Sequence, residues 1–235
     1  MNNLITRTIV LSTLSAAAIF TPITANAELH SKSRDIVVMQ ANDLPETAQL
    51  PANSFFLHPD NAGSTYLYIE QQQGARLAVF DVTDPSRIRL ASTTALANNG
   101  AFDFVGALNE QTELVRFRDG ERVAVLDLHK ATKPQLRTVE GLTDITVTDP
   151  LGPTALLVVN QRYAYVPAVA RDYQVVDTAG SNAPALLTTI KDVKHRVENG
   201  ETGTTFLLGS NGLTVVRQLS VEREYQIRQI QMQGN

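Results

Sequence analysis

The pattern of hydrophobic and polar positions repeats along the chain. Residues 77–85, LAVFDVTDP, consist of a strand-forming apolar run that ends at Asp81 and then breaks at an Asp-Pro turn. Weaker copies of this stretch begin at positions 36, 123, 173 and 213, so that successive copies start 41, 46, 50 and 40 residues apart. A period of about 40 to 50 residues is typical of propeller blades and similar β repeats.

Most copies are preceded by another stretch of strand-forming residues, which predicts hairpins. Residues 113–118 and 122–128 both alternate and are separated by Asp119-Gly120, the strongest short-range hairpin signal in the chain. Similar hairpins are expected to turn near Gly74 and at Asn211-Gly212, and residues 162–167 are expected to pair with 173–177. A turn and another short extended segment follow most copies, so each repeat offers three or four strands.

These repeats predict an all-β protein, because residues 28–235 contain no convincing amphipathic helix. Residues 225–232 also alternate and are expected to be extended. The expected architecture is a single β-propeller-like domain of four or five small blades, each with three to four antiparallel strands; a β-sandwich is the alternative. The strand at residues 36–39 can complete a sheet that begins at the C-terminus, which would settle the number of blades.

The repeat resembles the LVIVD repeat of exported and cell-surface proteins of bacteria and archaea. Residues 162–166, RYAYV, match the first half of that repeat, and residues 77–85 match the second. The resemblance covers residues 65–190, while Gln40 and Arg217 replace the repeated Asp in the outer copies. It implies a β-propeller and carries no shared reaction.

The first 27 residues have the features of a signal peptide. Arg7 precedes an apolar stretch at residues 9–23, and Ala25-Asn26-Ala27 places small residues before Glu28. An N-terminal membrane anchor is the alternative, but Thr21-Pro22 interrupts a stretch shorter than the ~20 residues that a spanning helix needs. We therefore expect cleavage before Glu28, a periplasmic or secreted location, and no membrane span in the mature chain.

Composition excludes several classes of function. The chain of 235 residues has no Cys, so it forms no disulfide and no cysteine metal site. Its net charge of −4 provides no basic surface for nucleic acid. With 6% aromatic residues and no Trp, it has few rings on which a sugar could stack. Sequence signatures of zinc proteases, P-loop proteins, serine hydrolases and dinucleotide-binding proteins are absent.

Four residues are candidates for a binding site at the mouth of a central channel. His58, Asp103 and His195 lie 23, 24 and 22 residues before the repeated position at 81, 127 and 217, and Asp149 is a less well aligned fourth. Equivalent positions on inner strands would converge on a propeller axis. Two imidazoles and one or two carboxylates would suit a transition metal. The alternative is that they are turn or solvated residues, and we expect no metal and no cofactor.

The repeated Asp81, Asp127 and Asp177 are expected to be structural, because each ends its own strand and can accept a backbone N–H of the following turn. The function expected is therefore binding or scaffolding, with loops presented on rigid repeats to another protein or a cell-envelope polymer. The alternative is a hydrolase or lyase acting on a polysaccharide or other polymer at the channel. Enzymatic activity is left open and is the less favoured of the two, and the sequence does not identify the ligand.

Overall fold

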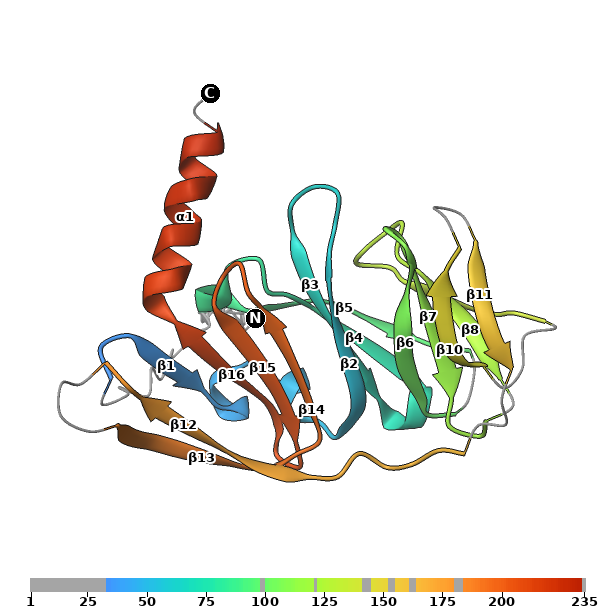
Figure 1. Cartoon of the computed structure of the whole chain (residues 1–235), viewed down its shortest axis with the longest axis horizontal. Helices are drawn as coiled ribbons and strands as arrows, with labels where there is room; N and C mark the ends of the chain where they lie inside the picture. The colour runs from blue at the N-terminus through green and yellow to red at the C-terminus, as the bar shows by residue number, and fades with distance from the viewer. Residues whose placement is uncertain are drawn as a thin grey trace, which may run out of the picture.

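Small antiparallel sheets make up most of the molecule, which confirms the all-β prediction (Figure 1). The computed structural model describes residues 33–97, 100–120, 122–140, 145–151, 155–160, 164–179 and 184–233. The described residues form sixteen strands, four short 3-10 helices and one α-helix. The predicted signal peptide lies outside the described residues.

The first two sheets each consist of four consecutive strands joined by short turns. Their orders are β2-β3-β4-β5 and β6-β7-β8-β9. The first comprises β2 (Ala52–Pro59), β3 (Thr65–Gln71), β4 (Arg76–Asp81) and β5 (Arg89–Ala95). The second comprises β6 (Phe102–Asn109), β7 (Thr112–Phe117), β8 (Val123–Asp127) and β9 (Gln135–Thr138).

The third four-stranded sheet joins the two ends of the described chain. Its order is β1-β16-β15-β14, so the first described strand, β1 (Ile36–Met39), pairs with the last described strand. The other members are β14 (His195–Asn199), β15 (Thr204–Gly209) and β16 (Gly212–Gln218). Val38 lies opposite Val216 in this antiparallel pair. The predicted completion of a C-terminal sheet by residues 36–39 is thus confirmed.

The remaining strands form two separate hairpins. Strand β10 (Ile145–Pro150) pairs with β11 (Leu156–Asn160), and β12 (Arg171–Asp177) pairs with β13 (Ala185–Val193). Residues 164–170 lie outside any strand, so the predicted hairpin between 162–167 and 173–177 is wrong for the residues that are described. A stretch that alternates needs a neighbouring strand edge to become a strand, and here β12 takes β13 as its partner.

The sheet β2-β3-β4-β5 is the centre of the core because it is covered on both faces. Leu67 and Phe80 face the C-terminal sheet and pack with Phe206 and Val215. Tyr68 faces the opposite way, towards the sheet β6-β7-β8-β9. Burial of both faces explains why residues 66–69, YLYI, form a continuous apolar run rather than a strict alternation.

The predicted turns and the repeated aspartates are confirmed. Gly74, Gly120 and Gly212 have φ values of +82°, +81° and +93° at the predicted hairpin turns. Each repeated aspartate accepts a hydrogen bond from the backbone N–H two residues later, at 2.8–3.0 Å, and these residues are Asp81, Asp127 and Asp177. This contact fixes the path of the chain as it leaves β4, β8 and β12.

The prediction of an extended C-terminal segment is wrong, because residues there form helix α1 (Leu219–Gln233). Strand β1 already occupies the edge of β16 on which a following strand would form a hairpin. The backbone N–H of Ser220 donates to the Asp35 carboxylate at 2.7 Å, which satisfies one of the free N–H groups at the helix start. Figure 1 shows α1 projecting away from the sheets. No helix in the described part of the chain is long and apolar enough to cross a membrane.

Candidate functional site

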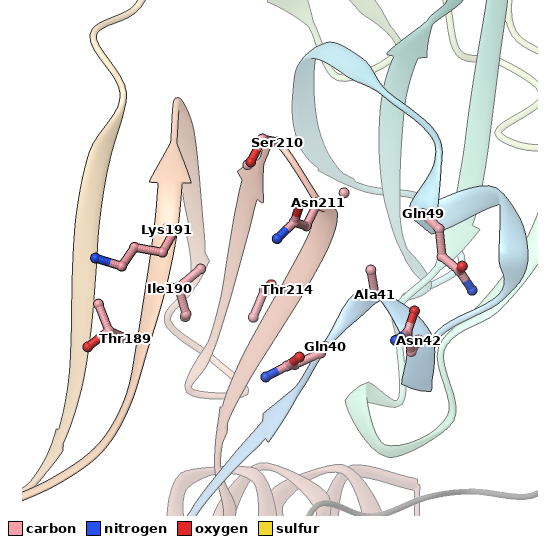
Figure 2. Close-up of a pocket in the computed structure, with 12 residues that line it drawn as sticks. Gln40, Ala41, Asn42, Gln49, Thr189, Ile190, Lys191, Ser210, Asn211 and Thr214 are labelled. Carbon is pink, nitrogen blue, oxygen red and sulfur yellow. The ribbon is translucent and has the colours of Figure 1, made fainter.

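A polar groove of about 530 Å³ lies between β13, the β15–β16 turn and the segment that follows β1 (Figure 2). That segment consists of two 3-10 helices, η1 (Ala41–Asp43) and η2 (Glu46–Gln49). We call this site the amide groove, because four amide side chains contribute to it, those of Gln40, Asn42, Gln49 and Asn211. The other lining residues are Ala41, Thr189, Ile190, Lys191, Gly209, Ser210, Gly212 and Thr214.

Three of these amide side chains have no partner within the described part of the chain. Asn42, Gln49 and Asn211 are exposed, and none of them makes a side-chain hydrogen bond to another described residue. Each carboxamide offers both donors and an acceptor. The amide groove can therefore pair with donors and acceptors of a ligand without breaking internal hydrogen bonds.

The amide groove is close to electrically neutral. Lys191 is the one charged residue among its described lining residues, and its Nζ lies 2.5 Å from Oδ2 of Asp172. This hydrogen bond raises the pKa of Lys191 and lowers the pKa of Asp172. Neither a carboxylate nor an imidazole belongs to the described lining, so the groove offers no evident general acid or base.

Two glycines allow the walls of the amide groove to approach closely. A Cβ on Gly209 would lie 2.9 Å from the carbonyl oxygen of Lys191, so β13 passes directly beside the end of β15. A Cβ on Gly212 would lie 2.4 Å from the carbonyl oxygen of Ala48, and the φ of Gly212 is +93°. A larger residue at position 212 would therefore push the turn away from η2.

A second polar cluster lies where β2, β6 and β14 meet. The Arg118 guanidinium donates from Nη2 to Oδ1 of Asp103 at 2.7 Å and to the backbone oxygen of Asn53 at 2.9 Å. The Arg118 guanidinium also lies over the ring of Tyr165, 4.6 Å from its centroid. His195 belongs to the same neighbourhood: burial lowers its pKa, the Asp103 charge raises it and the Arg118 charge lowers it.

Glu70 is the most deeply buried charged residue of this cluster, with no exposed surface. Burial raises its pKa to about 7, against the opposing influence of Asn53, Arg118 and the Gly74 backbone. Neither carboxylate oxygen makes a hydrogen bond of good geometry to a described residue. Because Glu70 is shielded and Asp103 is paired with Arg118, the cluster is suited to holding strands together rather than to contacting a substrate.

Those of the four predicted residues whose side chains are described do not gather at one point. Asp103 and His195 lie close enough to influence one another electrostatically. His58 lies five residues beyond Asn53 along β2, a separation of about 17 Å at 3.3 Å per residue. There it contributes to a cavity of about 200 Å³ with Asp60, Glu110 and His129. Asp149 is in β10, opposite Leu157, and its side chain lies outside the described residues.

No group of three or more His, Cys, Asp or Glu side chains in the described ranges could hold a metal ion. Burial lowers the pKa of His58, which makes the neutral imidazole more abundant. His129 lines the same cavity, but its Nδ1 lies 2.7 Å from the Asp127 carboxylate.

Sequence reasoning missed the amide groove altogether. Its residues come from a linker, a hairpin turn and an edge strand, and Asn, Gln, Ser and Thr at such places are ordinary turn residues. The pairing of β1 with β16 brings residues 40–49 beside the turn at 209–212, and no local pattern announces that contact. Glu70 was missed as well, although a charged residue following the apolar run 66–69 was a usable signal.

No known protein family matches this chain, and no curated protein is detectably similar to it.

Proposed function

We propose that this protein is an exported binding module that holds an extended, uncharged polypeptide segment in the amide groove. The observation that carries the proposal is the set of exposed carboxamides of Asn42, Gln49 and Asn211 on the walls of one groove, for which the described residues offer no hydrogen-bond partner. A peptide backbone presents alternating N–H and C=O groups, which match the donors and acceptors of such side chains. The near-neutral lining favours an uncharged segment over an ionic one.

A polypeptide fits the amide groove better than a sugar polymer does. Sugar-binding sites gain affinity from aromatic rings, and none of the described lining residues is aromatic. The edge of β13 that does not face β12 carries no strand among the described residues, and Thr189, Ile190 and Lys191 of this strand line the groove. An extended segment can therefore use the backbone of β13 as well as the amide side chains. The rival function, a hydrolase or lyase, lacks a carboxylate pair in this groove.

The proposal includes a propeller-like scaffold of four blades. Three four-stranded sheets, stacked through two shared apolar clusters, support this architecture, and the pairing of β1 with β16 is the kind of closure that protects strand edges. The resemblance to the LVIVD repeat and the signal-peptide features of residues 1–27 belong to the same proposal. In this proposal the sheets form a rigid support for the loops that line the amide groove, and the protein acts outside the cytoplasm.

Selection from a display library of random twelve-residue peptides tests the function. The target is residues 28–235, with counter-selection against the double variant Asn42→Ala/Asn211→Ala. We expect enrichment of peptides without charged residues that bind the original protein at least tenfold more tightly than the double variant. A matched control, Gln226→Ala on the exposed face of α1, should leave their affinity unchanged.

Two results would overturn the proposal. Selected peptides that bind the original protein and the double variant equally would place binding elsewhere, and a library that yields no enriched peptide would remove peptide binding. Incubation of the selected peptides with the protein, followed by mass spectrometry, should return them intact. Cleavage would support the rival hydrolase instead.

A further inference from the structure

The end of helix α1 has the sequence pattern of a strand. Residues 229–233 read QIQMQ, so every second residue carries a carboxamide. Ile230 and Met232 are two positions apart, which places them on nearly opposite sides of a helix but on the same face of a strand. A helix therefore cannot bury both side chains against one surface, whereas a strand can.

This part of α1 has little tertiary support. Ile230 and Met232 are 71% and 64% exposed, and no side chain of residues 229–232 makes a hydrogen bond to another described residue. The last such bond along the helix is made by Arg228, whose Nη2 donates to the backbone oxygen of Glu201 at 3.5 Å. A short helix in water depends mainly on packing of an apolar face for its stability. The turn after Arg228 can therefore unwind at small cost.

The composition of residues 229–233 matches the ligand expected for the amide groove. The segment contains no charged and no aromatic residue, as the near-neutral lining of the groove requires. Its carboxamides can exchange hydrogen bonds with those of the groove, because each carboxamide offers both donors and an acceptor. The segment thus pairs with the groove through the same chemistry that defines the groove.

The order of side chains along β13 is complementary as well. Where this strand lines the amide groove, it presents Thr189, Ile190 and Lys191, which are polar, apolar and polar (Figure 2). A strand added to this edge with Ile230 opposite Ile190 places an apolar pair between two polar pairs. Cross-strand pairs of matched character stabilise a sheet, and the backbone hydrogen bonds of an added strand contribute affinity.

We propose that the amide groove of one copy binds residues 229–233 of a second copy as an added strand. This inference rests on the proposed function and names its ligand. The groove lies at the Gly212 end of β16, whereas α1 begins at the opposite end, after Gln218, and projects away from the sheets (Figure 1). To reach its own groove, α1 would have to unwind beyond Arg228 and lose the contact with Glu201. Binding to a second copy requires only the last turn to unwind.

Engineered cysteines test the pairing, because the chain contains none. We would prepare Ile190→Cys and Ile230→Cys as separate variants of residues 28–235, mix them and oxidise the mixture. Residues opposite each other in paired antiparallel strands have Cα atoms about 4.5–5.5 Å apart, which is within the range of a disulfide. We expect a disulfide between position 190 of one chain and position 230 of another, located by peptide mass mapping. The control pair Ile190→Cys with Ile227→Cys should give at least about tenfold less, because three residues move a side chain by about 10 Å along a strand.

Self-association in sedimentation provides a second readout. Ile230→Asp should raise the dissociation constant between copies by at least about tenfold, because the substitution brings a charge into the contact. The matched control Ile227→Asp lies in the same helix outside residues 229–233 and should change this constant by less than about twofold. Both variants should keep the circular dichroism spectrum, since Ile230 and Ile227 are 71% and 49% exposed.

Three results would overturn the inference. The first is a protein that stays monomeric at about 100 μM, which corresponds to a negligible affinity between copies. The second is a disulfide within one chain of the double variant Ile190→Cys/Ile230→Cys, and the third is an equal effect of Ile230→Asp and Ile227→Asp on association. If library peptides bind the amide groove while the copies stay apart, the proposed function stands and only this inference fails.

Discussion

Arg118 joins three strands by holding Asp103 in an ion pair with an Nη2–Oδ1 distance of 2.7 Å while also donating to the Asn53 backbone. The side chains of Arg118 and Asp103 are 17% and 22% exposed, so water screens the pair only partly. Removing the guanidinium would leave the Asp103 carboxylate without its counterion and the Asn53 carbonyl oxygen without its donor.

We therefore expect Arg118→Met to reduce the free energy of unfolding by about 2–4 kcal/mol, within or slightly below the range for breaking buried ion pairs. The pKa of His195 should rise, because Arg118 lowers it and Asp103 would remain. Urea unfolding and NMR titration of the histidine ring would measure the two effects. The control Arg196→Met removes an ion pair whose partners are 49% and 54% exposed and should cost less than about 1 kcal/mol. Equal costs for both variants would contradict the role of Arg118.

Glu70 should make stability depend on pH. Burial raises its pKa from the ordinary 4.5 to about 7, so the folded protein keeps this proton over a range in which the unfolded chain has lost it. The stabilisation is fully present below about pH 4.5 and is lost as the pH rises through 7. Burial raises the pKa of Glu113 to about 7 as well, and its contribution has the same sign.

Glu70→Gln imitates the protonated side chain at every pH. We expect the variant to match the original protein near pH 4 and to exceed its free energy of unfolding by on the order of 2 kcal/mol at pH 8. Urea denaturation at several pH values would show the divergence. The control Glu46→Gln, at an exposed position, should change the free energy of unfolding by less than about 0.5 kcal/mol. If the free energies of unfolding of Glu70→Gln and the original protein differed by the same amount at every pH, titration of Glu70 would not be the cause of the pH dependence.

The attachment of helix α1 depends on a buried ion pair. Arg217 in β16 donates to both carboxylate oxygens of Glu222 at 2.8–2.9 Å, and the two side chains are only 7% and 6% exposed. Glu222→Gln should reduce the free energy of unfolding by about 3–5 kcal/mol, because the Arg217 guanidinium would remain buried without its counterion. Hydrogen exchange should show loss of protection in α1 before the sheets.

Two further variants separate charge burial from helix formation in α1. Glu224→Gln removes an exposed carboxylate from the same helix and should cost less than about 0.5 kcal/mol. Arg217→Met/Glu222→Leu replaces the pair with apolar side chains and should recover most of the stability lost in Glu222→Gln. If the double variant did not recover this stability, the ion pair itself would be needed to hold α1 in place against β16.

Gly212 should be much less tolerant of substitution than Gly63, although both have positive φ. The φ values are +93° and +82°, but an added Cβ at position 212 would lie 2.4 Å from the Ala48 oxygen, whereas at position 63 it would meet nothing within 4 Å. Gly63→Ala should cost about 1 kcal/mol from backbone strain alone. Gly212→Ala should reduce the free energy of unfolding by at least about 2 kcal/mol more than Gly63→Ala does. It should also weaken peptide binding, because the displaced turn carries Asn211. Thermal melts of both variants would compare them directly, and similar costs would disprove the steric contribution.

The mature protein should begin at Glu28. Expression in a bacterial host followed by intact-mass measurement of the periplasmic or secreted fraction would detect cleavage after Ala25-Asn26-Ala27. Retention of residues 1–27 would indicate the membrane anchor instead.

The sequence by itself determined the strands and turns of the repeated hairpins. Alternation at residues 113–118 and 122–128, with Gly120 between them, specifies a hairpin because both signals act within a few residues. The same holds for Asp81, Asp127 and Asp177, whose hydrogen bonds reach only two residues along the chain. The proposed joining of residues 36–39 to the C-terminal sheet also followed from the count of repeats.

Only the tertiary structure decided which strand edges were available for pairing and which side chains from distant parts of the sequence lie close together. Residues 225–232 carry an alternating pattern, yet β1 already covers β16, so this segment forms a helix instead of another strand. His58 and His195 have similar offsets but lie in different surroundings. The His195 ring lies 6.3 Å from the ring of Phe55, whereas His58 is three residues, or about 10 Å, further along β2 and is close to Asp60. The amide groove is lined by residues about 170 positions apart, such as Gln40 and Ser210, and long-range packing of this kind leaves no periodic trace in a sequence.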